Sequence, residues 1–248
     1  MRPGALFDEG VEIHIAEGHG FAAYFYLLIL FVPIVFLALF LPALDAQVWI
    51  APGAFFNVSS VAAMILIAFF TLRVANQEFA PWRFVPLRRR LVEEHISAVE
   101  VALGQLCLLG LQIAVFILLA APLLVWAGAI ARVPAVKILA VFVLLFFYAL
   151  AYGVWGLAAA ASWGRKLEVR QVFIRAFFIS AMIFTAVWYL PLNPVAFLLS
   201  YLGDKQTAPL LLLGRRWAPG AAHFLFHFFL LGAGLAAYYR ALRREIFS

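Results

Sequence analysis

Charged residues are scarce in this sequence and almost absent from its long apolar stretches. Only 12% of the 248 residues are Asp, Glu, Lys or Arg, whereas about 25% is usual in a soluble domain. Runs such as 20–42, 101–127 and 136–163 exceed the ~20 residues that a helix needs to cross ~30 Å of hydrocarbon. With 67% hydrophobic residues, the sequence predicts a polytopic membrane protein without a separate soluble domain.

Motifs that carry catalysis are also missing. The sequence contains no GxxxxGK[ST] phosphate loop, no GxGxxG turn and no GxSxG serine turn. We therefore expect a protein that is not an enzyme, and any ATP hydrolysis must come from another polypeptide. The single cysteine, Cys107, excludes an intrachain disulfide. A cleavable signal peptide is not expected, because the first apolar run is too long and follows acidic residues.

The apolar runs predict an all-α integral membrane fold, a single permease-sized domain over 1–248. They lack the alternation of a transmembrane barrel, so helices are expected to satisfy the backbone in lipid. Several tryptophans fall near the ends of the runs, where their rings prefer to lie. We expect six spans, at about 20–43, 57–76, 99–127, 136–163, 171–190 and 221–240.

The Lys and Arg residues predict the orientation. Thirteen of the 18 fall at the N-terminus, after the second and fourth spans, and after the last span. The positive-inside rule then places both termini in the cytoplasm of a bacterial inner membrane. The net charge of +6 is explained by these clusters beside the spans, so nucleic acid is not an expected partner and the lipid bilayer is. The five remaining basic residues lie on the outer side: Arg132, Lys137, Lys205, Arg215 and Arg216.

Three regions differ from plain loops. The segment 1–19 carries apolar residues at helical spacing over 5–19 and predicts a helix along the interface, although its alternation at 11–15 also fits a short strand. The stretch 77–98 is charged and is broken by prolines before a short expected helix. The outer region 191–220 holds two apolar pieces too short to cross the membrane, which favours a re-entrant or interfacial pair of half-helices. These pieces are 195–202 and 210–213.

Ionisable residues in the middle of a span would suggest a relay or a cofactor site. The middles of the expected spans lack Asp, Glu, Lys and Arg, and Glu100 lies at a helix start, where a carboxylate is favoured. His223 and His227 stand four residues apart on one helical face, a spacing that can bind metal or haem. One pair supplies only two ligands, so interhelical hydrogen bonding is the favoured role and no metal is expected.

The three consecutive arginines Arg88, Arg89 and Arg90 have three interpretations. They can anchor the topology on anionic lipid headgroups, dock a cytoplasmic partner, or, least favoured, bind nucleic acid. Pro86 precedes them and the acidic pair Glu93 and Glu94 follows. A proline, a basic cluster and an acidic pair before the chain re-enters the membrane favour a rigid docking element.

Two segments carry a resemblance to a known family. They are NQEFAPWRFVPLRRRLVEEHISAVEVALGQL (76–106) and LPLNPVAFLLSYL (190–202). With the N-terminal interfacial segment and the long third and fourth spans, the layout resembles the membrane domain of a type 2 ABC transporter, the exporter class with six spans per subunit. The family's Glu-Arg-Glu followed by Gly-Thr appears here only as Asn76–Gln77–Glu78, and its Gly-Lys appears as Gly104–Gln105.

The resemblance implies a permease that is moved by a separate ATPase. The loop between spans two and three would form a coupling helix on the ATPase, with ATP and Mg bound by that partner and no cofactor bound by this chain. Cytoplasmic ABC ATPase subunits and a second permease subunit, identical or not, would be the partners. Coupling residues would be Glu78, Pro86, Arg88, Arg89, Arg90, Glu93 and Glu94. A second cytoplasmic contact would use Arg165, Lys166, Glu168 and Arg170, and Asn193 and Pro194 would mark the re-entrant element.

Two other functions stay open at this stage. A membrane scaffold or anchor of an ATPase-driven envelope machine would share the same layout without moving a substrate. A haem-binding membrane protein would use His223 and His227 as ligands. Neither the cargo of an exporter nor the identity of the second permease subunit follows from the sequence.

Overall fold

The structure is a computed structural model of the full chain. It describes residues 52–77, 97–163, 166–205, 207–212 and 214–247, together with Phe7, 10–12, 24–26 and 28–32. Within this part of the chain, five helices are long and apolar enough to cross a membrane. The chain is therefore a multi-pass, helical membrane protein. These helices are α3 (Pro52–Gln77), α5 (Ala98–Ile130), α6 (Ala135–Trp163), α7 (Leu167–Trp188) and α9 (Pro219–Phe247).

The five helices coincide with the second to sixth expected spans, but most of them run further at their ends. The last helix reaches Phe247, whereas the sequence predicted its end near 240. The first expected span, 20–43, lies outside the described residues except for helical pieces at 24–26 and 28–32. The expected interfacial segment 1–19 is likewise described only at Phe7 and 10–12.

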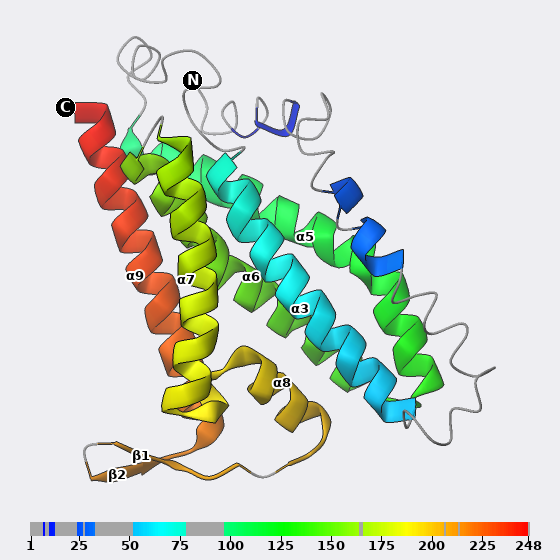
Figure 1. The fold of residues 1–248 in the computed structure, drawn as a ribbon. Coiled ribbons are helices and arrows are strands. Elements are labelled where there is room, and N and C mark those ends of the chain that lie inside the picture. The colour runs from blue at the N-terminus through cyan, green and yellow to red at the C-terminus, as the bar shows by residue number, and fades with distance from the viewer. Residues whose placement is uncertain are drawn as a thin grey trace.

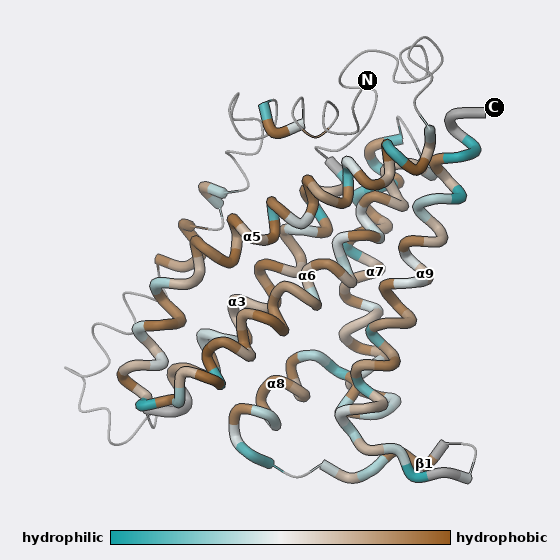
Figure 2. Tube along the Cα trace, turned by 180° about the vertical axis from the view of Figure 1, so that it is seen from behind, coloured by the Kyte–Doolittle hydropathy of each residue, from teal (hydrophilic) through white to brown (hydrophobic). Residues whose placement is uncertain are grey.

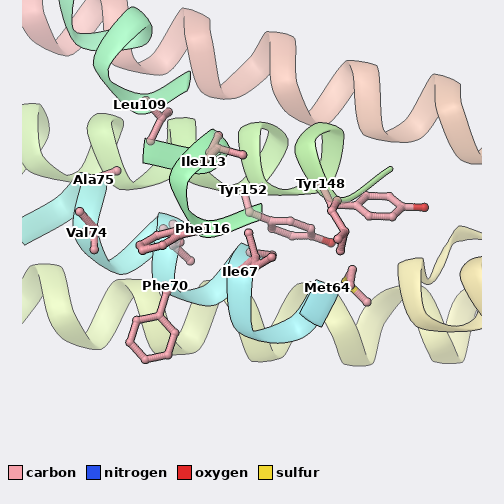
Figure 3. Close-up of a cluster of buried hydrophobic side chains, with 14 of the residues drawn as sticks. Met64, Ile67, Phe70, Val74, Ala75, Leu109, Ile113, Phe116, Tyr148 and Tyr152 are labelled. Atoms are coloured by element: carbon pink, nitrogen blue, oxygen red, sulfur yellow. The ribbon is translucent and has the colours of Figure 1, made fainter. Parts of the chain in front are cut away.

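Helix α6 is the centre of the bundle. It packs against α3, α5, α7 and α9 and also contacts the short helix α8 (Figure 1). Its face toward α3 carries Gly153 and Gly156, which let the two backbones approach closely. Large side chains of α3, α5 and α6 fill the space between them, including Ile67, Phe116 and Tyr152 (Figure 3).

The helices are apolar along most of their length (Figure 2), and many of their large apolar side chains are exposed, as expected for a surface that faces lipid. Leu118 on α5 is 72% exposed and Val187 on α7 is 82% exposed. Helices α7 and α9 are the least buried of the five, and α7 is the less buried of the two. Most of the surface of α7 is therefore open to lipid or to another subunit.

The start of α5 has a clear local cause. The Ser97 side chain accepts a hydrogen bond from the Glu100 backbone N–H, at 3.2 Å between Oγ and N, and the Glu100 carboxylate accepts from the Ser97 N–H at 2.7 Å. This capping box satisfies two backbone donors that the helix itself cannot pair. The carboxylate expected at this helix start therefore caps it.

The chain between α7 and α9 forms an irregular end of the bundle. It contains the 3₁₀ turn η4 (Leu190–Leu192), the half-helix α8 (Pro194–Leu202) and the strands β1 (Leu210–Leu212) and β2 (Arg215–Trp217). Both views place α8 and the strands at the same end of the bundle, where α6 and α9 begin (Figures 1 and 2).

One of the two predicted half-helices is present and the other is wrong. The piece 195–202 is helical, whereas Leu210–Leu212 forms a strand paired antiparallel with Arg215–Trp217. The run is too short to close helical hydrogen bonds, and Gly214, with φ +73°, permits the tight turn that joins the two strands. Among the described residues, the fold is all-α apart from this hairpin.

Candidate functional site

The residues predicted to couple to an ATPase lie outside the described part of the chain. This applies to Glu78, Pro86, Arg88, Arg89, Arg90, Glu93 and Glu94, and to the short helix expected at 87–99, of which only the end is described. Helices α3 and α5 flank this segment. The last turn of α3 and the first turn of α5 lie on the side of the bundle opposite α8 (Figure 1). The coupling role stays a prediction.

The second predicted contact lies between α6 and α7, at the same end. Lys166 and Glu168 are exposed, Arg170 is buried at 3% exposure, and Arg165 is outside the described residues. An exposed pair can reach a partner directly, whereas a buried side chain cannot. Lys166 and Glu168 are therefore the better contact candidates.

The predicted re-entrant element is organised by Asn193. Its Oδ1 accepts hydrogen bonds from the backbone N–H groups of Val195 and Ala196, at 2.9 and 3.1 Å. Its Nδ2 donates to the Met182 carbonyl at 2.9 Å and to Thr185 Oγ1 at 3.2 Å. One buried side chain therefore caps α8 and fastens it to α7, and Pro194 occupies the first helical position, which needs no N–H donor.

His223 fastens the same element to two further helices. Its Nδ1 lies 2.8 Å from the Pro191 carbonyl oxygen in η4, and its Nε2 lies 2.7 Å from the Tyr148 hydroxyl on α6. Because a carbonyl oxygen can only accept, Nδ1 carries the proton, and the Tyr148 hydroxyl donates to Nε2. The neutral ring satisfies both partners. The interhelical hydrogen bonding expected from this histidine is thus present.

Aromatic contacts surround the histidine pair. The Phe197 ring of α8 stacks on His223, with ring centroids 3.8 Å apart and an interplanar angle of 10°. His227 lies one turn further along α9, and its Nδ1 donates to the His223 carbonyl at 3.0 Å. Phe147 and Tyr148 flank His227, with centroids at 6.2 and 5.2 Å. Side chains of α6, α8 and α9 therefore pack here as one unit.

The hydrogen bonds of His223 argue against its use as a metal or haem ligand. Both of its ring nitrogens are engaged, so a metal would have to displace Tyr148 or Pro191. Within the described residues, no group of three or more His, Cys, Asp or Glu could hold a metal ion. Among the described residues, His227 Nε2 has no hydrogen-bond partner, so it is the nitrogen of this pair that is left to accept a ligand.

An ion pair closes the far end of α8. The Lys137 ammonium lies 2.7 Å from an Asp204 carboxylate oxygen. Asp204 adopts φ +51° immediately after the helix cap Gly203, and the Lys205 N–H donates to the Ser200 carbonyl at 2.9 Å. This is a Schellman-type helix end with Asp in the left-handed position. It aims the carboxylate at α6.

The hairpin is attached by Tyr189, which follows α7. Its hydroxyl donates to the Ala208 carbonyl at 2.6 Å. Desolvation raises the pKa of the Tyr189 phenol, so the hydroxyl keeps its proton and remains a donor. The loop before β1 is thereby held beside the end of α7.

We expect Tyr148→Phe to destabilise the protein by about 1 kcal/mol. The change leaves His223 Nε2 buried without its donor, and single hydrogen bonds between membrane helices average ~0.6 kcal/mol, with a maximum near 1.7. Tyr152→Phe is the matched control, since its buried hydroxyl has no hydrogen-bond partner among the described residues. Thermal unfolding in detergent should separate the two variants. Equal midpoints would contradict the role given to the Tyr148–His223 bond.

Sequence reasoning identified Asn193 and the histidines but missed Tyr148, the partner of His223, and the whole Lys137–Asp204 pair. The two residues of each pair are separated by 75 and 67 positions, respectively, so no local pattern joins them. A comparison of the chain with protein families, with curated proteins and with solved structures finds no match.

Proposed function

We propose that this protein is the membrane-spanning permease subunit of an ATP-driven exporter similar to the type 2 ABC transporters. It would couple ATP hydrolysis by a separate cytoplasmic ATPase to movement of a substrate across a bacterial inner membrane. The observation that carries this proposal is the pairing of two features at opposite ends of one bundle. A capped half-helix precedes the last span at one end, and the charged segment 77–98 leaves α3 and enters α5 at the other.

The packing of α3 and α6 supports a mechanical role. Motion applied at 77–98 would act first on α3 and α5, which flank that segment. Helix α3 packs closely on α6, and α6 is joined to α9 through Tyr148 and His223. The Phe197 ring of α8 stacks on the same histidine. A displacement at the proposed cytoplasmic end therefore has a continuous path of packed side chains to the proposed outer end.

Gln105 shows how the chain departs from the family pattern. It occupies the position where the family has lysine, and its Oε1 accepts a hydrogen bond from the Tyr238 hydroxyl of α9. A polar tie between the third and the last spans thus occurs near the proposed cytoplasmic side. In this chain the position serves helix packing within the subunit.

Affinity purification in mild detergent tests the proposal most directly. We expect a Walker-A ATPase to copurify at about one copy per permease, together with a second permease subunit. Repeated absence of any ATPase would overturn the exporter proposal and favour an anchoring role. An ATPase that copurifies without any substrate-stimulated activity in liposomes would favour a mechanical subunit of an envelope machine.

We expect the triple variant Arg88→Ala, Arg89→Ala, Arg90→Ala to reduce the copurified ATPase by about tenfold. Three ion pairs at a partner surface contribute up to about 1 kcal/mol each, and 1.4 kcal/mol is a factor of ten. The matched control removes the same charge from the end of α9, through Arg240→Ala, Arg243→Ala and Arg244→Ala, at three exposed positions. Quantitative immunoblotting of the purified complex gives the measurement. Equal losses in both triple variants would indicate a general charge effect.

A separate variant tests on which side of the membrane the segment 77–98 lies. A cysteine introduced at Arg89, in a Cys107→Ala background because Cys107 is exposed, should resist a membrane-impermeant maleimide in intact cells. It should react after the cells are opened. Labelling from outside would place the segment on the wrong side for an ATPase and would end the proposal.

A further inference from the structure

We propose that the groove between α6, α8 and α9 and the polar pocket beside it form one binding site for a phospholipid with an anionic headgroup. The groove would hold an acyl chain and the pocket would hold the headgroup. This inference does not depend on the proposed ATPase coupling, because it concerns a lipid bound to the permease subunit alone.

The groove is apolar and open to the lipid side of the bundle. Its volume is about 550 Å³, within the ~300–1,000 Å³ of sites that bind small molecules. Helix α6 contributes Ala140 and Val143, and α9 contributes Phe224 and Phe228. Three of these side chains are at least one-third exposed, so the groove is not filled by the protein itself.

The polar pocket adjoins the groove directly. It has a volume of about 470 Å³ and includes Ser200, Asp204, Lys205 and Thr207. Phe197 and Tyr201 line both cavities, so an apolar and a polar compartment meet along α8. The junction lies where α6 and α9 begin, which is where a headgroup region would meet the hydrocarbon core.

The charges around the pocket favour an anion. Lys137 is paired with Asp204 at 2.7 Å. Lys205, which lines the pocket, has no ion-pair partner among the described residues. Two cations and one carboxylate give a net charge of +1 at the junction. The hydroxyls of Ser200 and Thr207 can donate hydrogen bonds to phosphate oxygens.

The combination selects a lipid rather than another helix. A packed helix would bury the groove but would leave Lys205 and the hydroxyls unmatched, whereas a phospholipid matches an apolar strip and a basic, hydroxyl-lined end at once. Tyr201 stands at the boundary, where amphipathic rings are favoured. The ligand is therefore one molecule with an acyl chain in the groove and its phosphate beside Lys205.

Photo-crosslinking of the full chain in lipid nanodiscs tests this site. The probes are phosphatidylglycerol and phosphatidylcholine, each with a diazirine in one acyl chain, and the crosslinked peptides are identified by mass spectrometry. We expect phosphatidylglycerol to label 136–147 and 224–228 at least about fivefold more than phosphatidylcholine does. A factor of five corresponds to one favourable charge near a lipid surface.

Two variants and two matched controls locate the headgroup and the chain. Lys205→Gln should remove most of the preference for phosphatidylglycerol, whereas Arg216→Gln, on the exposed strand beyond the pocket, should keep it. Ala140→Trp should fill the groove and reduce labelling by both probes. Ala186→Trp, at an exposed position on α7 near the same end of the bundle, should not. Lys205→Gln changes only a surface residue, so the test survives if the tryptophan variant fails to fold.

Three results would overturn the proposal. Equal labelling by the two probes, unchanged in Lys205→Gln, would mean that only general boundary lipid covers the groove. Crosslinks from the groove residues to a second copy of the chain would make this face a subunit interface. A preference for phosphatidylglycerol that Arg216→Gln removes as strongly as Lys205→Gln would place the headgroup at the hairpin.

Discussion

Gly156→Leu is expected to abolish the folded bundle, with a loss of about 3 kcal/mol or more. A Cβ atom on Gly156 would meet the carbonyl oxygen of Leu72 and would lie 2.9 Å from Cβ of Ala75. Overpacking usually costs ~1–3 kcal/mol because side chains yield. Here the nearest atom is backbone, which cannot rotate away, so α3 and α6 must separate. Since α6 holds four other helices, the loss would spread through the fold.

Gly232→Leu is the control for this prediction. Gly232 is an exposed glycine within α9, and a Cβ atom there meets nothing within 4 Å. Leucine is the better helix former, so this variant should be as stable as the parent or slightly more stable. Fluorescence-detected size-exclusion chromatography and thermal unfolding of both variants measure the contrast. Similar behaviour of the two would show that α3 and α6 are not tightly apposed at Gly156.

Asn193→Ala is expected to destabilise the re-entrant element by about 2–3 kcal/mol. The variant loses the cap on α8, which contributes ~0.5–2 kcal/mol, and two hydrogen bonds to α7. The backbone N–H groups of Val195 and Ala196 then lack acceptors in an apolar environment. Hydrogen exchange measured by mass spectrometry should show faster exchange over 194–202, with exchange in the middle of α5 unchanged.

Two further variants divide this effect into its parts. Asn193→Ser keeps a capping oxygen but is too short to bridge to α7, so it should lose only part of the stability. Thr185→Val removes one acceptor of the Asn193 amide and should lose about 0.6 kcal/mol. We expect the order Asn193→Ala, then Asn193→Ser, then Thr185→Val. An Asn193→Ala variant with parental exchange over 194–202 would show that α8 forms without its cap.

The long helices could be predicted because their signal is one of composition. An unbroken apolar run has to be helical in lipid, whatever its neighbours are. Helix ends depend on finer signals. The local pattern Ser97-x-x-Glu100, a capping box, indicates the start of α5. The pair Asn193–Pro194 indicates the start of α8, because asparagine is a favoured cap and proline is favoured in the first turn.

The hairpin and the polar ties could not be predicted in the same way. The run Leu210–Leu212 is apolar in either conformation, and only pairing with Arg215–Trp217 makes it a strand. The partners of His223 and Asp204 come from α6, far away in sequence. Hydropathy describes how favourably a side chain such as tyrosine or lysine is solvated. It does not predict which residue that side chain contacts by a hydrogen bond or an ion pair.

The bond pattern at His223 has a consequence for movement. Its Nδ1 donates to the Pro191 carbonyl and its Nε2 accepts from the Tyr148 hydroxyl, so a 180° flip of the ring would place C–H groups against both partners and break both hydrogen bonds. A shift of α9 that pulls the ring from Tyr148 must also pull on Pro191, which lies in η4 between α7 and α8. We therefore expect η4, α8, the end of α7 that Asn193 ties to them and the first turns of α9 to move together with α6 as a rigid block.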